Sequence, residues 1–328
     1  MAKNVTDEET RAERREELIR GRPYEILRAL RSALREIVSD RVGLFGVGVV
    51  GALVILAIFA PLIAPKDPAA QDLTDALKPP FWYADGDFAN ALGTDSLGRD
   101  ILSRMIYGTR ITILVGVSVV AVSGAFGTVM GLIAGYKGGR TDSIIMRVVD
   151  TQVAFPGLLL ALVILAVIQP SATTVIVVLA LNGWMVYARM TRGVVLSVRE
   201  TPYVDAAEIV GCKPKRIIFR HILPNLTSPL LTLAVLEFAR IILAESALSF
   251  LGLGIQPPQV SWGLMIAQGK DYLFSAWWLV TFPGVAISLT VLGVNLLASW
   301  LRVVADPQER EKRFAQSSTH QTGAGTGT

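Results

Sequence analysis

Six runs of apolar residues alternate with polar segments along the chain, and each has about the length of a membrane-spanning helix. Such a helix needs about 20 residues to cross a bilayer core of about 30 Å. The runs cover residues 42–64, 111–136, 143–168, 172–187, 226–250 and 276–301, the third being densest over 153–168. The pattern predicts an all-α, polytopic membrane protein with six transmembrane helices.

The segments between the runs predict the connections. Only Gln169, Pro170 and Ser171 separate the third run from the fourth, so these two helices should form a hairpin. Pro156 and Pro283 lie inside apolar runs, where each frees a backbone carbonyl and can kink its helix. The first run starts more than forty residues into the chain and is too long for the apolar part of a signal peptide, so we interpret it as a span.

Composition supports a membrane protein. Hydrophobic residues make up 52% of the chain and charged residues 18%, against about 25% charged in a typical soluble domain. The net charge of +4 would suggest nucleic acid in a soluble protein, but here the basic residues lie between apolar runs. We therefore expect cationic loops beside a lipid bilayer and no nucleic-acid partner. One cysteine, Cys212, and two histidines, His221 and His320, exclude an internal disulfide and a Cys/His zinc site.

The distribution of Lys and Arg predicts the orientation of the chain. Six spans put both termini on one side, and that side carries 24 of the 31 basic residues against 6 on the other. Loops rich in Lys and Arg stay in the cytoplasm. We therefore expect cytoplasmic termini and four segments: a charged cytoplasmic segment 1–42, a first span with a long external loop 43–110, a core transmembrane domain 111–301 and a cytoplasmic tail 302–328.

The two terminal segments carry little else. Leu27, Leu30, Leu34 and Ile37 recur near helical spacing with arginines between them. Two interpretations are open: an amphipathic helix lying on the membrane surface, and a solvated helix leading into the first span. The chain ends in SSTHQTGAGTGT, a low-complexity composition that we expect to be partly disordered.

A basic segment, DAAEIVGCKPKRIIFRHILPN at residues 205–225, interrupts the apolar pattern between the fourth and fifth runs. Thr201 and Pro202 form a good helix start, and Gly211 lies where a helix end favours a left-handed residue. Pro214 can begin a second short helix, which Pro224 should end before the fifth span. The first helix has one face of Tyr203, Ala206, Ala207 and Val210, and the exposed side carries Lys213, Lys215, Arg216 and Arg220. The segment predicts a small cationic docking shape made of two helices with a corner at Gly211.

This segment resembles the EAA motif of binding-protein-dependent ABC importer permeases, in which EAA is followed by three residues, a glycine, nine residues and I-x-L-P. Asp205, Ala206 and Ala207 match the EAA triplet with Asp for Glu, Gly211 matches the glycine, and the motif's isoleucine position holds His221. In that family the loop forms coupling helices that sit in a groove of an ATPase subunit. The resemblance implies an ATPase-coupling role for Asp205, Ala206, Ala207, Gly211, Lys213, Arg216, Leu223 and Pro224.

The resemblance covers about residues 42–307. GTDSLGRDILSRMIYGTR, GLIAGYKGGRTDSIIMRVVD, ALSFLGLGIQPPQVSWGLM and AWWLVTFPGVAISLTVLGVNLL all resemble the C-type permease of dipeptide, oligopeptide and nickel importers. The resemblance implies a type I importer permease fold in a bacterial cell membrane, with a five-helix core and one extra N-terminal helix. It also implies a second homologous permease as heterodimer partner, two ATPase subunits that bind ATP and Mg, an extracytoplasmic substrate-binding protein and a peptide substrate.

Motifs for catalysis are missing from the sequence. GxxxxGK[ST], G-x-S-x-G and HExxH do not occur, and Gly135, Gly138 and Gly139 lie in a short loop without a strand before it. We therefore expect a non-catalytic subunit without metal or cofactor, whose ATP chemistry belongs to another polypeptide.

The fifth apolar run carries three ionisable residues, Glu237, Arg240 and Glu245. Such groups are costly at membrane depth and usually face a cavity or a partner. Glu237, Arg240 and Glu245 are candidates for the lining or gate of a translocation path. Glu237 and Arg240 can also pair along one helix, and for them we favour a structural pair that packs against the second permease. For Glu245 two readings stay open, a structural role and a polar lining of the translocation path. A rival function is a secondary transporter that uses these acids as a proton site; importers of nickel complexes or other small solutes are a further alternative.

Overall fold

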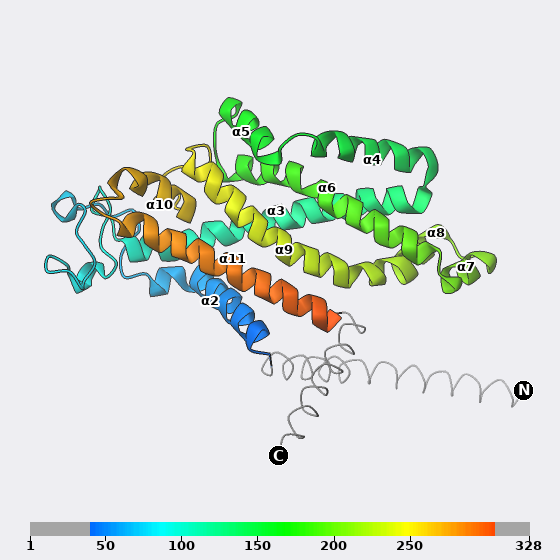
Figure 1. Cartoon of the computed structure of the whole chain (residues 1–328), viewed down its shortest axis with the longest axis horizontal. Coiled ribbons are helices and arrows are strands. Elements are labelled where there is room, and N and C mark those ends of the chain that lie inside the picture. Colours follow the sequence, from blue (N-terminus) through cyan, green and yellow to red (C-terminus); the bar gives the residue numbers. More distant parts are fainter. Residues whose placement is uncertain (1–39, 306–328) are drawn as a thin grey trace, which may run out of the picture.

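The computed structural model describes residues 40–305, and within this range the chain is helical, with an isolated bridge between Thr94 and Asp100 in place of any strand. Long helices lie side by side along the longest axis of the molecule (Figure 1). The loop before α3 and the short helix α10 (Trp262–Gly269) gather at one end, and α7 (Pro202–Ile209) and α8 (Pro214–Ile217) lie at the other. We call these the α10 end and the α7 end.

Five helices in the described range are long and apolar enough to cross a membrane, and a bent pair makes up to six. The five are α2 (Arg41–Ile63), α3 (Ile101–Lys137), α6 (Ala172–Arg199), α9 (Leu223–Phe250) and α11 (Trp278–Ala305), where α9 continues α8. The pair is α4 (Gly139–Val153) and α5 (Gly157–Val167). Short single turns complete the described chain: η1 (Leu73–Asp75), η2 (Phe88–Asn90), η3 (Ile218–Ile222) and η4 (Lys270–Tyr272). The predicted six-span, all-α class is confirmed; the predictions for the N-terminal segment and the tail fall largely outside the described residues.

Two helices are longer than the apolar pattern predicts. α3 begins at Ile101 instead of residue 111, and Asp100 caps it by accepting from the backbone N–H of Ser103. α6 continues past residue 187 to Arg199. A 37-residue helix is about 55 Å long, well beyond a bilayer core of about 30 Å. Hydropathy marks only the stretch inside the bilayer, so it missed the polar ends that project from it.

The third predicted span is bent by 80° between α4 and α5. Pro156 stands at the N-cap of α5, as its lack of an N–H group favours. The Gln152 side chain fixes the end of α4 by donating to the Leu181 carbonyl oxygen (2.6 Å) and accepting from the Trp184 indole (3.1 Å). The third predicted span is therefore a bent pair of helices, and the bend lies at Pro156, where the sequence allows a kink. By contrast, α11 continues through Pro283.

The predicted break at Pro224 is also wrong. α8, η3 and α9 follow one another without interruption and form one helical span over Pro214–Phe250. η3 is a wider π-helical turn, and Pro224 lies in the first turn of α9 directly after it. A π turn changes the hydrogen-bond pattern of the helix at the point where Pro224 has no N–H to donate, so the chain stays helical.

Helices α3 and α6 meet along a line of glycines four residues apart, Gly127, Gly131 and Gly135, which we call the glycine seam. The expectation that Gly135 lies in a loop is wrong, because α3 continues to Lys137. A Cβ on Gly131 would lie 2.5 Å from the Ala188 carbonyl oxygen, and one on Gly135 would lie 2.8 Å from the Val195 Cβ. Small residues let two membrane helices bring their backbones together, and van der Waals packing then replaces the missing hydrophobic drive. The seam therefore fixes α6 against α3.

We predict that Gly131→Ala destabilises the chain by about 1–3 kcal/mol, because the added methyl group has no room at the seam. Gly193→Ala is the matched control: it lies in α6 with open space around it, where alanine favours a helix by about 1 kcal/mol. The measurement is thermal unfolding of the purified protein in detergent. Equal melting temperatures for the two variants would contradict close packing at the seam.

Candidate functional site

The corner between α7 and α8 at the α7 end has the predicted form. Gly211 adopts a left-handed conformation with φ +81°, and the Cys212 N–H donates to the Ala207 carbonyl oxygen across the corner (3.0 Å). This bonding pattern closes a helix end where glycine carries the positive φ. Thr201 is at the N-cap and Pro202 in the first turn, but the Thr201 hydroxyl donates to the Val198 carbonyl oxygen instead of capping α7. That bond ties the start of α7 to the last turn of α6.

The inner face of the corner is apolar and completely buried. The cluster joins one residue of α6 to residues of α7, α8, η3 and α9, and half-buried Leu132 and Tyr136 of α3 pack against it. Its five members, each at most 1% exposed, are Val195, Val204, Ile217, Ile222 and Leu226. The cluster fixes the corner to three long helices, so it cannot swing independently without exposing apolar surface to water.

The outer face of the corner combines exposed apolar and charged side chains. Ile209 and Val210 are 86% and 82% exposed, and Phe219 is also exposed. The exposed charged residues around them are Asp205, Glu208, Lys213, Lys215, Arg216 and Arg220. Large apolar residues in such a setting mark a surface that a partner covers. We call Ile209, Val210 and Phe219 the apolar tip. The sequence predicts the basic residues around the corner but not the apolar tip.

The remaining residues of the predicted coupling loop divide between the faces. Ala206 and Pro224 are exposed, whereas Ala207 and Leu223 are half-buried against the inner cluster. His221, at the motif's isoleucine position, has its ring 6.1 Å from the Tyr203 ring. Asn225 holds this turn by donating to the His221 carbonyl oxygen (2.6 Å) and to the Tyr203 hydroxyl (3.3 Å). The departure from the motif therefore leaves the last turn ordered and tied to α7.

The charged residues of α9 have separate environments. Glu237 is buried and accepts two bonds from Arg240, at 2.6 and 2.9 Å, so the predicted pair is formed. The Arg240 side chain is 54% exposed. Glu245 is 1% exposed and accepts a bond from Ser249 (2.7 Å), whose hydroxyl also accepts from the Ile255 N–H (3.1 Å). In this conformation Ser249 joins α9 to the loop before α10, and Glu245, bonded to Ser249 within α9, is buried away from any substrate.

Comparison with known proteins places these features in a family. A family model described as the binding-protein-dependent transport system inner membrane component matches residues 127–311, more than half of the chain. The chain belongs to this family. A second model, the N-terminal TM domain of oligopeptide transport permease C, matches residues 29–80. The chain is thus an inner-membrane, multi-pass permease component of an ABC importer, which confirms the resemblance found in the sequence.

The chain matches curated relatives over most of the length of both proteins. The chain is 46% identical over 267 residues to the dipeptide transport system permease protein DppC of Escherichia coli, covering 81% of this chain and 89% of that protein. It is 42% identical over 256 residues to the di/tripeptide transport system permease protein DppC of Pseudomonas aeruginosa, covering 78% and 84%. The DppC protein of Haemophilus influenzae is 39% identical over 273 residues, covering 83% and 92%.

The two faces of the corner should respond differently to mutation. Ile217→Ala removes a buried side chain of the inner cluster and should lower stability by about 2–5 kcal/mol. Phe219→Ala, two residues away on the apolar tip, should change stability by less than about 0.5 kcal/mol. Thermal unfolding of the purified chain measures both. A larger loss for Phe219→Ala than for Ile217→Ala would show that the faces are assigned the wrong way round.

Proposed function

We propose that this chain and a second homologous permease form the translocation path of an ATP-driven importer for dipeptides or similarly short peptides. Two separate ATPase subunits hold the complex at the α7 end, and ATP and Mg are bound there and not by this chain. The observation that carries the proposal is the two-faced corner. Its inner face is packed against the spans, and its outer face exposes an apolar tip within a loop that has the spacing of the ATPase-coupling motif.

The mechanism is mechanical transmission. Closure of the ATPase subunits displaces the corner, and the buried cluster passes the displacement to α6 and α9. α8 and α9 belong to one continuous helical span, so a push on α8 reaches the middle of the membrane without a flexible joint. If the ATPase subunits bound the corner equally strongly in the inward-open and outward-open states, their binding would not shift the equilibrium between the two states. The corner must therefore transmit the motion of the ATPase subunits as a rigid body.

The excess of Lys and Arg supports a cytoplasmic α7 end with both termini on the same side. The α10 end then faces outward, and the substrate-binding protein docks on the segments 65–110 and 251–275, which include the start of α3 and the short helix α10. The half-exposed Arg240, paired with Glu237 on a membrane span, favours a second permease that covers this face, because an ionic pair open to lipid is costly. The chain itself is non-catalytic.

The peptide class rests on the relatives, which carry dipeptide or di/tripeptide names. The proposed path uses ATP and not an ion gradient. A transport assay separates this proposal from its two alternatives, a secondary transporter and a nickel-complex importer. We expect uptake of labelled dipeptides into proteoliposomes to need ATP and the binding protein. Uptake by this chain alone without ATP would overturn the proposal.

We predict that Val210→Asp on the apolar tip lowers recovery of the ATPase subunits with the purified permease pair by about tenfold or more. An interface that buries a valine side chain gains about 1.5–3 kcal/mol, and an aspartate there also has to lose its water. Leu73→Asp is the matched control, because Leu73 is also exposed but lies in the loop at the α10 end.

The control variant should retain the ATPase subunits fully. Both variants leave the buried cluster intact, so both should insert and purify in normal amounts. If Val210→Asp retains the ATPase subunits as fully as Leu73→Asp does, then the apolar tip is not the docking surface.

A further inference from the structure

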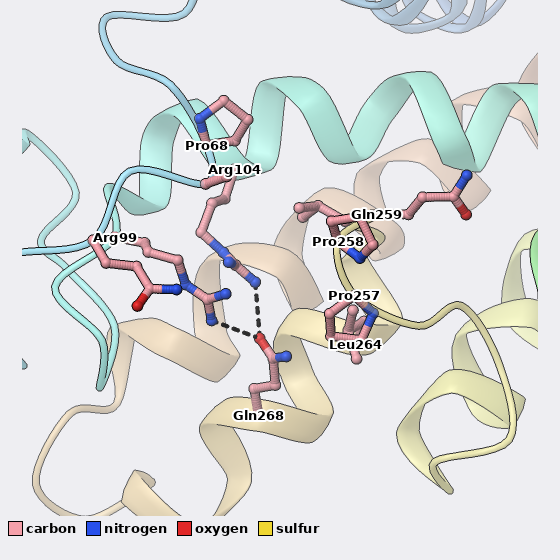
Figure 2. Close-up of a pocket in the computed structure, with 11 residues that line it drawn as sticks. Pro68, Arg99, Arg104, Pro257, Pro258, Gln259, Leu264 and Gln268 are labelled. Atoms are coloured by element: carbon pink, nitrogen blue, oxygen red, sulfur yellow. Dashed lines mark hydrogen bonds between the residues drawn. The ribbon is translucent and has the colours of Figure 1, made fainter.

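A cavity of about 320 Å³ opens at the α10 end, between the loop that follows α2, the start of α3 and the segment that leads into α10 (Figure 2). Its volume is in the range of small-ligand sites. Three prolines, Pro68, Pro257 and Pro258, form part of its wall and restrict the backbone there. α3 is longer than the bilayer is thick, so its first turn, with Arg104, lies among the polar loops.

Two arginines meet inside this cavity. Arg104 and Arg99 both donate to the side-chain oxygen of Gln268, at 2.8 and 3.2 Å, as the dashed lines of Figure 2 mark. Arg104 is 2% exposed, and its Nε has no hydrogen-bond partner among the described residues. A buried guanidinium nitrogen without an acceptor is costly, so the arrangement favours an added acceptor.

The local charge is not balanced. Within residues 40–305, Asp95 is the acid that pairs with the two arginines, 2.7 Å from Arg99 Nε and 3.6 Å from Arg104 Nη1. It also accepts from the backbone N–H groups of Leu97 and Arg99, and it does not line the cavity. One carboxylate thus serves two guanidinium groups, and the residues that line the cavity include no acidic side chain. The cavity has a net positive charge and planar donors that suit a carboxylate.

We infer that this cavity receives an acidic side chain of the docked substrate-binding protein. The inference rests on the proposed function, which places that protein on the loops that build the cavity. A free peptide carries an N-terminal ammonium group as well as its C-terminal carboxylate, and the residues that line the cavity offer the ammonium group no acidic partner. A single carboxylate on a larger partner meets the charge of the cavity without this cost. The inserted side chain would fix the position of the binding protein over the permease.

The test introduces a competing carboxylate at the rim. Ala69 lines the cavity and is exposed, and its neighbour Ala70 is exposed but does not line it. Ala69→Glu should place a resident carboxylate against the arginines and weaken binding of the substrate-binding protein by about tenfold. Ala70→Glu adds the same charge next door and should change the affinity by less than about twofold. Gln71→Glu, an isosteric change at another lining residue, should act like Ala69→Glu.

The experiment uses the complete importer in nanodiscs, with the binding protein titrated and its affinity measured at low and high salt. The Ala69→Glu and Gln71→Glu complexes should also lose most of the salt dependence that the unmodified complex shows. Equal affinities for Ala69→Glu, Gln71→Glu and Ala70→Glu would overturn the inference. The inference would also be overturned if labelled dipeptide bound the importer in the absence of the binding protein and the Ala69→Glu variant lost this binding. If the binding protein did not change the rate of ATP hydrolysis by the unmodified complex, the proposed function itself would be overturned.

Discussion

Close contact between α3 and α6 at the glycine seam is the constraint on which the rest of the structure depends. Because the backbones meet there, α6 leaves the bundle in a fixed direction and carries the start of α7 at its end. The Arg199 side chain at the end of α6 then donates to the backbone carbonyl oxygen of Tyr136, near the end of α3 (3.1 Å). The buried cluster beneath the corner completes the arrangement by joining α9. The α7 end is therefore built as one body with the spans.

Several of the charged groups in this apolar chain form ion pairs that join helices or the turns of one helix. Asp142 of α4 pairs with Arg192 of α6 through two bonds of 2.5 and 2.6 Å, so the amphipathic helix α4 lies against the bundle. Glu245 Oε1 accepts from Ser249, whereas its buried Oε2 has no hydrogen-bond partner among the described residues. Arg240 is paired with Glu237 but half-exposed, and the buried Arg104 Nε has no partner among the described residues; the proposals place a second permease at the first and a binding protein at the second.

Sequence reasoning recovered what local chemistry determines. The apolar runs located the spans, and the positive φ of Gly211 follows from its place at a helix end. It failed where tertiary context decides. Pro224 was expected to stop a helix, but a π turn before it absorbs the missing bond. The tip residues Ile209 and Val210 carry no periodic signal that separates them from core positions in an eight-residue helix. The cavity brings Arg104 to Gln268 across 164 positions, a meeting that only the fold creates.

The central claim is that the corner and the spans move as one body when the ATPase subunits close. Its direct measurement is the distance between spin labels at Glu208 in α7 and Leu243 in α9, both exposed, in a Cys212→Ser background of the complete importer. A second label pair across the two permeases reports that the transition occurs. The account predicts an unchanged distribution from Glu208 to Leu243 with and without bound ATP, while the cross-permease distance shifts. A shift of both distributions would contradict it, because the corner would then hinge on the spans.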